Sequence, residues 1–417
     1  MSKLILDWSV ICHRAWHTMF SANYVATDDE VVEWTRNVAK EVIYLTTRFE
    51  ADEIVFAMDA PSNWRADYVK DWYHTKTDFY MDVTNPNHWY VKVDKKVREI
   101  KYSDITCTWS VSKALSAKDE TVLELDNAQM YYHFKEGVTP EIVLEQWPNV
   151  PKHVTLLKSW EGIQLAIPYY KGTRSTAPWP AKTPKKTFKA LIPELGNKLA
   201  MMVQAKPIMV NYAEGDDVIA TIIQKWAKDS PDELITLVSV DADLKQLFVT
   251  TPSLMIYEPT KRVLFEESPD KANFQLILKI LGGDTSDNIK GVSFKKKRGT
   301  FPTVSFDAET GEPKGGKTTI NWVKSIVDEA EKEGLKGQEI WSRVYRTIEK
   351  EAVLDTYYRN LVLVYLSNLP IEITSSILDM YDNIELEDHN MTWKSFEVGD
   401  QDLTLMRKQA ILDVEGM

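Results

Sequence analysis

The sequence has few cysteines, no long apolar run and no excess of positive charge. Its 417 residues include two cysteines, Cys12 and Cys107, which are too few and too far apart for a disulfide framework or a cysteine zinc site. This scarcity favours a reducing compartment, and we expect a cytoplasmic protein. The longest apolar run, 361–366, is far shorter than the roughly 20 residues that span a bilayer, so we expect no membrane association.

The net charge of −12 argues against a polyanionic partner, because neutralising phosphates needs local positive charge. Basic residues nevertheless gather in three places. Such runs are usually solvated faces, although each could also contact nucleic acid. The three clusters are Lys92, Lys95, Lys96, Arg98 and Lys101; Lys182, Lys185, Lys186 and Lys189; and the run Lys295, Lys296, Lys297 and Arg298.

Three short apolar segments each end in an aspartate, namely 4–7 (LILD), 53–59 (EIVFAMD) and 234–241 (LITLVSVD). Their length and β-branched residues predict buried parallel strands, with helical stretches between them. The pattern predicts an α/β fold with a central, mostly parallel sheet flanked by helices. Because functional groups collect beyond the carboxyl ends of such strands, we expect Asp7, Asp59 and Asp241 at one acidic rim.

A further group of acids precedes a predicted helix. Apolar residues from Val218 to Trp226 recur at a helical period, which places Glu214, Asp216 and Asp217 in the first turn. Acids there favour the helix dipole, but three in four positions exceed what a cap needs.

The acids of the predicted rim, those of the helix start and three further aspartates form a set that requires cations. Two unit charges about 4 Å apart repel by roughly 4 kcal/mol at an effective dielectric of 20. Oxygen ligands without histidine or cysteine select hard ions, so we expect Mg²⁺ or Mn²⁺. Each acid alone could equally be a cap or a turn residue. The set is Asp7, Asp59, Glu214, Asp216, Asp217, Asp241, Asp243, Asp284 and Asp287.

Six motifs in order carry a family resemblance: LILDW, FAMDAPSNWR, YYKGTR, AEGDDVIATI, SVDADLKQLF and ILGGDTSDNIKGV. Together they resemble the 5′-nuclease (flap endonuclease) family, which has a PIN-like core, and most closely its T-even bacteriophage members. The stretch 357–378 strengthens the closer match. The resemblance implies removal of RNA primers and 5′ flaps in lagging-strand replication, by a 5′→3′ exonuclease and structure-specific flap endonuclease that leaves 5′-phosphate products. If a phage encodes the chain, the host cytoplasm is its expected location.

The resemblance also implies a division of the chain. Residues 1–74 are expected to form the first part of the nuclease core, and 75–160 an inserted, partly β subdomain. Residues 161–270 are expected to contain an arch segment and the second part of the core. Residues 271–417 are expected to form a helical C-terminal domain with a helix-hairpin-helix.

Two metal ions are implied by the resemblance, each with its own carboxylates. Asp7, Asp59, Asp216 and Asp241 would hold the first ion, with Glu214 nearby. The second would be held, partly through water, by Asp217, Asp243, Asp284 and Asp287. A K⁺ ion at the hairpin is a further implication.

The matched motifs imply contacts with nucleic acid as well. Lys171 and Arg174 would share a helical face and reach the scissile phosphate, and Tyr170 could stack on a base. The hairpin around Gly291 would contact phosphates without reading sequence. Arg65 and the basic run from Lys295 to Arg298 complete the predicted surface. The implied partners are DNA with 5′ ends or flaps and RNA–DNA hybrid; a single-strand-binding protein and a sliding clamp are suggested by the family alone, and we expect a monomer.

The sequence leaves alternatives for both the site residues and the function. Tyr73 with Lys76 is a weaker match that competes with Tyr170 and Lys171, because Arg65 and Tyr170 lie far apart. Residues 311–318 (GEPKGGKT) fit the P-loop pattern of an ATPase, but the preceding segment is polar and a loop that caps a helix is preferred. A catalytically weak, structure-specific DNA-binding protein is the other alternative.

Overall fold

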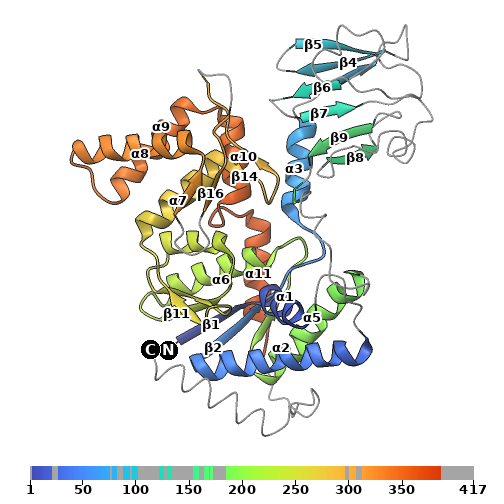
Figure 1. Ribbon diagram of the computed structural model, residues 1–417, viewed down its shortest axis with the longest axis vertical. Coiled ribbons are helices and arrows are strands. Elements are labelled where there is room, and N and C mark those ends of the chain that lie inside the picture. Colours follow the sequence, from blue (N-terminus) through green and yellow to red (C-terminus); the bar gives the residue numbers. More distant parts are fainter. Residues whose placement is uncertain are drawn as a thin grey trace.

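The computed structural model describes residues 2–20, 27–75, 78–81, 88–93, 96–101, 122–125, 129–132, 154–158, 164–168, 170–171, 185–295, 300–306 and 312–386 (Figure 1). Within this part of the chain, no helix is long and apolar enough to cross a membrane.

A six-stranded sheet forms the centre of the N-terminal region, with the order β10-β2-β1-β11-β12-β13. All neighbouring strands are parallel except β12 and β13. The predicted central, mostly parallel sheet is therefore confirmed, and the three strands expected from the sequence lie side by side in it. The strands are β1 (Ser2–Asp7), β2 (Glu53–Ala57), β10 (Lys206–Ile208), β11 (Leu234–Val238), β12 (Leu254–Glu258) and β13 (Val263–Phe265).

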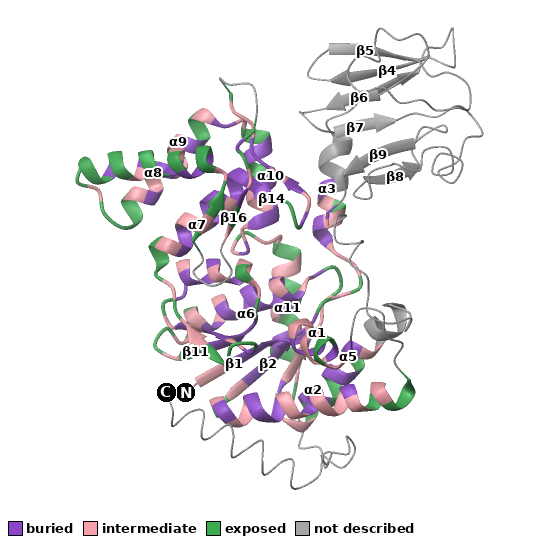
Figure 2. Cartoon of the chain, in the orientation of Figure 1, coloured by how far each residue is buried: buried purple, intermediate pink, exposed green. Residues whose placement is uncertain are grey.

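Helices cover both faces of this sheet because successive strand residues point to opposite sides. Leu4 and Leu6 of β1 pack in a core with α1 (Trp8–Met19), α2 (Asp28–Phe49) and α5 (Lys185–Met202). Ile5 faces the opposite core, with α6 (Gly215–Asp229), the 3₁₀ helix η4 (Ala242–Val249) and α11 (Ile371–Asn383). Buried residues line both faces of the sheet in Figure 2. The apolar period predicted for the helix after Glu214 is confirmed, since Val218 and Trp226 are buried.

The C-terminal region is mostly helical and has its own apolar core, centred on α7. Ser268 caps α7 by accepting a hydrogen bond from the Lys271 backbone N–H at 3.2 Å. The last described helix, α11, returns to the sheet, where the Trp226 indole donates to the Tyr381 hydroxyl at 2.9 Å. The elements are α7 (Pro269–Gly282), β14 (Gly283–Asp284), β15 (Ile289–Lys290), β16 (Val304–Phe306), β17 (Pro313–Gly315), α8 (Lys317–Lys332), α9 (Gln338–Glu351), α10 (Leu354–Val364) and α11.

The predicted helix-hairpin-helix is present in its first helix and its hairpin. Helix α7 leads into the antiparallel pair β14–β15, but α8 begins only at Lys317. The hairpin instead packs against α10, where the Asn360 amide donates to the carbonyl oxygens of Ile280 at 2.8 Å and Lys290 at 2.7 Å.

The region predicted as an insertion follows helix α3 (Trp64–Thr75) and contains paired antiparallel strands. Its partly β character is confirmed for the residues described, while the predicted domain boundaries stay predictions. The strands are β3 (Asp78–Met81), β4 (His88–Val93), β5 (Lys96–Lys101), β6 (Val122–Leu125), β7 (Gln129–Tyr132), β8 (Val154–Lys158) and β9 (Gln164–Pro168).

The glycine-rich loop before α8 is a helix cap. Gly316, with φ of 46°, is the N-cap residue of α8, and the preceding β17 pairs only with β16 in a two-stranded antiparallel sheet. A P-loop needs a strand of a parallel sheet before its glycines. The arrangement therefore favours the capping interpretation over the ATPase alternative.

Candidate metal centre

The carboxyl ends of three neighbouring parallel strands deliver aspartates to one rim, as the sequence predicts. Asp7 ends β1, Asp59 follows β2 by two residues and Asp241 follows β11 by three. The Ser239 hydroxyl donates to Asp7 Oδ2 at 2.7 Å and accepts from the Asp241 backbone N–H at 3.0 Å. Asp7 and Asp241 are thereby held through one serine.

Helix α6 presents its N-terminus to the same rim. The Gly215 backbone N–H donates to Asp59 Oδ1 at 2.7 Å, which fixes the first turn of α6 against the end of β2. A Cβ at Gly215 would lie only 3.3 Å from Asp59 Oδ1, so glycine suits this close approach. Asp216 is half-buried in this turn.

Burial and repulsion between neighbouring acids raise the pKa values of two carboxylates in this group. Burial, followed by repulsion from Asp59 and Asp241, raises the pKa of Asp7 to about 7. Burial and then repulsion from Asp241 and Asp7 raise the pKa of Asp216 well above its usual range. Such a group binds either protons or cations, and its all-oxygen donors suit Mg²⁺ or Mn²⁺. Asp7, Asp59, Asp216 and Asp241 therefore fit the first predicted ion.

A second group forms where η4 meets the hairpin after α7. Carboxylate oxygens of Asp243, Asp284 and Asp287 all lie within 4.8 Å of one another. The Ser286 backbone N–H and hydroxyl donate to Asp284 Oδ1 at 2.7 and 2.6 Å, which orients that carboxylate. Three acids from two elements thus converge, and their oxygen donors fit the second predicted ion.

Lys279 of α7 bridges two of these acids. Its ammonium lies 2.7 Å from Asp284 Oδ2 and also pairs with Asp243. Burial raises the pKa of Asp284, but Lys279 and then Ser286 outweigh it and leave that pKa at about 2. Burial raises the pKa of Asp243 to about 6, against the opposing effect of Lys279. The sequence analysis missed Lys279, although one lysine within the apolar segment LILKILG was a signal.

Tyr170 and Lys171 reach the acids from a turn, which corrects the predicted helical placement. Lys171 has φ of 58°, and its backbone N–H donates to the Asp287 carbonyl at 2.9 Å. Its ammonium pairs with Glu214. Tyr170 is 7% exposed and its hydroxyl contacts Asp287 Oδ2 at 2.9 Å and Glu214 Oε2 at 3.2 Å. A buried ring has no face to offer a base, so the stacking expectation is wrong for this structure.

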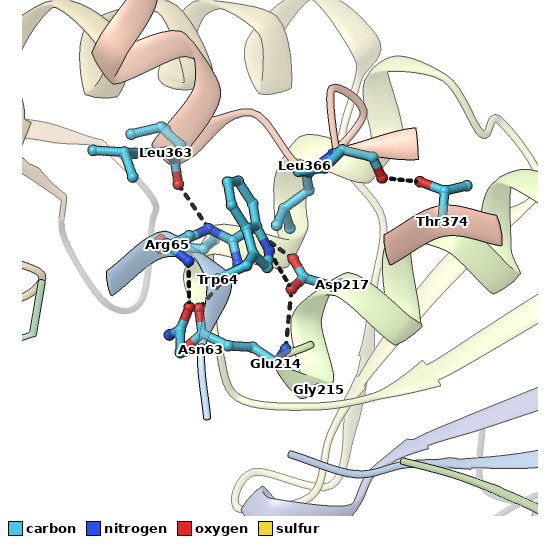
Figure 3. Close-up of polar contacts among 12 residues, drawn as sticks. Asn63, Trp64, Arg65, Glu214, Gly215, Asp217, Leu363, Leu366 and Thr374 are labelled. Carbon is cyan, nitrogen blue, oxygen red and sulfur yellow. Dashed lines mark hydrogen bonds and ion pairs between the residues drawn. The ribbon is translucent and has the colours of Figure 1, made fainter. Parts of the chain in front are cut away.

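Arg65 and Asp217 are buried in a network at the start of α3, shown in Figure 3. The Arg65 guanidinium donates to Asp217 at 2.6 Å and to Glu214 at 3.0 Å. Asp217 also accepts from the Trp64 indole at 2.9 Å. Because Arg65 is only 2% exposed, its predicted contact with nucleic acid is wrong for this structure. Asp217 is fully buried and lies outside the group of Asp243, Asp284 and Asp287.

The predicted nucleic-acid contacts of the hairpin region are only partly described. A Cβ at Gly291 would lie 2.0 Å from the Phe301 carbonyl oxygen, so tight packing accounts for this glycine. The Lys295 ammonium donates to the carbonyl oxygens of Glu349 at 2.7 Å and Lys350 at 3.1 Å, near the end of α9. This contact is a helix cap rather than a free basic surface. Arg174, Lys296, Lys297 and Arg298, with the competing Lys76 and the Tyr73 side chain, lie outside the described residues.

One cavity lies between Asp216 of the first group and the second group of acids; Asp7, Asp59 and Asp241 are not among its lining residues. It is lined by Glu214 and Asp216 from the start of α6, and by Asp243, Asp284 and Asp287 from the second group. Arg65, Tyr170 and Lys279 also line it, and Leu363, Val364 and Leu366 form an apolar wall. Five of the nine predicted acids therefore line one cavity, and Asp7, Asp59, Asp217 and Asp241 do not.

Comparison with known proteins gives one sequence relative that bears on this cavity's chemistry. The chain is 26% identical over 187 residues to the Ribonuclease H of Enterobacteria phage T4, and the match covers 45% of this chain and 54% of the relative. This similarity agrees with the resemblance of the motifs and covers about half of each chain. No protein-family model matches the sequence.

Two solved structures resemble the chain at low similarity. A bacteriophage T5 flap endonuclease in a pseudo-enzyme–product complex with DNA and metal ions is 13% identical, with a TM-score of 0.39 over the full length of both chains. A T5 5′-exonuclease with divalent zinc ions is 14% identical, with a TM-score of 0.40 over 99% of this chain and 100% of that one. The T4 relative bears out the T-even resemblance of the motifs, and the chain spans about half the length of that relative.

Proposed function

We propose that the chain is a divalent-metal-dependent 5′ nuclease, which acts as a 5′→3′ exonuclease and a structure-specific flap endonuclease on DNA duplexes and RNA–DNA hybrids. The observation that carries the proposal is one cavity lined by Glu214 and Asp216 from the start of α6 and by the group Asp243, Asp284 and Asp287. The match to T4 Ribonuclease H supports it. Removal of RNA primers and 5′ flaps during replication is the biological role that this activity would serve.

The carboxylates form two sets of metal ligands. Asp7, Asp59, Asp216 and Asp241 would hold one ion, and Asp243, Asp284 and Asp287 the other. Bound Mg²⁺ ions would acidify the attacking water and stabilise the charge that develops on the phosphate.

Lys171 supplies a positively charged side chain near the cavity, and this charge is the second part of the proposed mechanism. Lys171 lies beside Glu214 and Asp216, and these acids, with Asp287, raise its pKa although burial opposes them. Its ammonium therefore stays charged and would hold the scissile phosphate, as the family resemblance implies for this position and for Arg174. The hairpin at Gly291 would position the duplex through backbone contacts, so the enzyme would recognise structure rather than sequence.

A product-length assay tests the proposal. We expect 5′-labelled flap, nicked and RNA-primed duplexes to be cut near the 5′ end or the flap junction with Mg²⁺, and to stay intact with EDTA. A duplex whose ends are closed by hairpins is the matched control and should not be cut exonucleolytically. Binding of flap DNA without turnover in Mg²⁺ or Mn²⁺ would contradict the proposal and support the DNA-binding alternative.

A further inference from the structure

Arg65 stands where the chain leaves the nuclease core, and it connects three separate elements. It lies in the first turn of α3, which leads toward the region predicted as an insertion. Its guanidinium donates to Asp217 and Glu214 at the start of α6, and its Nε donates to the Leu363 carbonyl in α10 at 3.2 Å. Figure 3 shows these partners around one guanidinium.

The two acids that Arg65 binds have different surroundings. Asp217 is fully buried, and its oxygens also accept from the Trp64 indole at 2.9 Å and from the Glu214 backbone N–H at 3.0 Å. Glu214 lines the cavity beside Asp216, and its side chain keeps 13% exposure. Arg65 therefore has one partner that anchors it and one partner that faces the site.

Glu214 also contacts two residues that follow the predicted insertion. Its Oε2 accepts from Arg65 at 3.0 Å and lies 3.2 Å from the Tyr170 hydroxyl, while Oε1 pairs with Lys171. Arg65, which precedes residues 66–169 in the sequence, and Tyr170 and Lys171, which follow them, thus contact the same carboxylate. The Arg65 guanidinium is planar, is 2% exposed and has three partners, so its position is well defined.

We infer that Arg65 is a positioning residue, which fixes Glu214 toward the metal centre and makes no contact with DNA. The inference rests on the proposed function and assigns Arg65 a role different from the nucleic-acid contact that its motif suggested. Partners that orient the ligands of a metal centre typically contribute 10–100-fold to metal affinity.

A double-mutant cycle on Mn²⁺ affinity, measured by electron paramagnetic resonance, tests this role. Arg65→Lys keeps the positive charge but loses the planar guanidinium that bonds several partners at once. We expect it to weaken Mn²⁺ binding about tenfold. In a Glu214→Gln background the same change should have little further effect, because Arg65 acts through Glu214. Two independent, additive losses would overturn the inference.

The affinity for flap DNA in Ca²⁺ separates positioning from direct contact. We expect Arg65→Lys and wild type to bind the flap with equal affinity and equal salt dependence. An Arg65→Met variant with a salt slope lower by about 1 would show that Arg65 contacts a phosphate, and would overturn the inference.

Two further variants control for stability. Arg48, on α2, is also buried, and it donates to the Tyr44 hydroxyl at 3.0 Å in the core away from the acids. Arg48→Lys should lower the melting temperature without changing Mn²⁺ affinity; a matching loss of affinity would overturn the inference. If Arg65→Lys does not fold, Asp217→Asn weakens the same anchor and should shift Mn²⁺ affinity in the same direction.

The outcome for Arg65 is independent of the cleavage assay. If wild type binds Mn²⁺ but cuts none of the substrates, the proposed function fails while the cycle still decides the role of Arg65. If wild type binds no Mn²⁺, the positioning role is overturned.

Discussion

Replacing Asp216 with asparagine is expected to raise the melting temperature of the metal-free protein and to reduce Mg²⁺-dependent flap cleavage on the order of 10³-fold. The two effects have one cause. Burial and repulsion from Asp241 and Asp7 hold the pKa of Asp216 well above its usual range, so its ionised form destabilises the folded protein at neutral pH. The neutral amide removes that repulsion and weakens the ligand set.

Thermal unfolding in EDTA and single-turnover cleavage in Mg²⁺ measure the two effects. Asp229→Asn is a matched control, because Asp229 lies at the other end of α6 and pairs with Lys225 at 3.1 Å on the surface. This variant should leave cleavage unchanged and stability within about 0.5 kcal/mol. An Asp216→Asn protein that is less stable than wild type in EDTA, or that cleaves at the wild-type rate, would contradict the account.

Replacing Lys279 with methionine is expected to destabilise the metal-free protein strongly and the Mg²⁺-bound protein much less. Lys279 is the positive charge between Asp243 and Asp284, with a side chain 17% exposed. Removing one partner of a buried ion pair leaves an uncompensated charge, which costs about 3 kcal/mol. A divalent ion held by the same carboxylates would supply the missing charge, so Mg²⁺ should restore most of the loss.

Denaturant unfolding with and without Mg²⁺ checks this result. Lys198 provides the matched control, because its pair with Glu194 is on the surface of α5 with side chains 50% and 61% exposed. Lys198→Met should change the free energy of unfolding by less than about 1 kcal/mol in either buffer. Equal losses for Lys279→Met with and without Mg²⁺ would show that the three carboxylates bind no ion.

The central sheet and its acidic rim could be predicted from the sequence because both follow from local patterns. An apolar run that ends in aspartate predicts a buried parallel strand, and parallel strands bring their carboxyl ends together. Asp7, Asp59 and Asp241 therefore converge without any knowledge of the tertiary contacts. The same reasoning places Asp216 correctly at the first turn of α6.

The remaining contacts depend on partners that are remote in sequence. Asp216 and Asp217 are adjacent, yet one turns to the rim and the other to Trp64 and Arg65, whose positions only tertiary packing sets. An aromatic residue such as Tyr170 can stack on a base, but in this structure its hydroxyl contacts Glu214 and Asp287 and its ring is buried. Lys279 reads locally as a basic residue in the last turn of a helix, which is itself favourable. These roles could not be read from spacing.

Anomalous scattering from crystals soaked in Mn²⁺ would locate the bound ions. We expect two peaks, one beside the carboxylates of Asp7, Asp216 and Asp241 and one beside those of Asp243, Asp284 and Asp287. No peak at either group, or Mn²⁺ bound only elsewhere on the protein, would contradict the two-ion proposal.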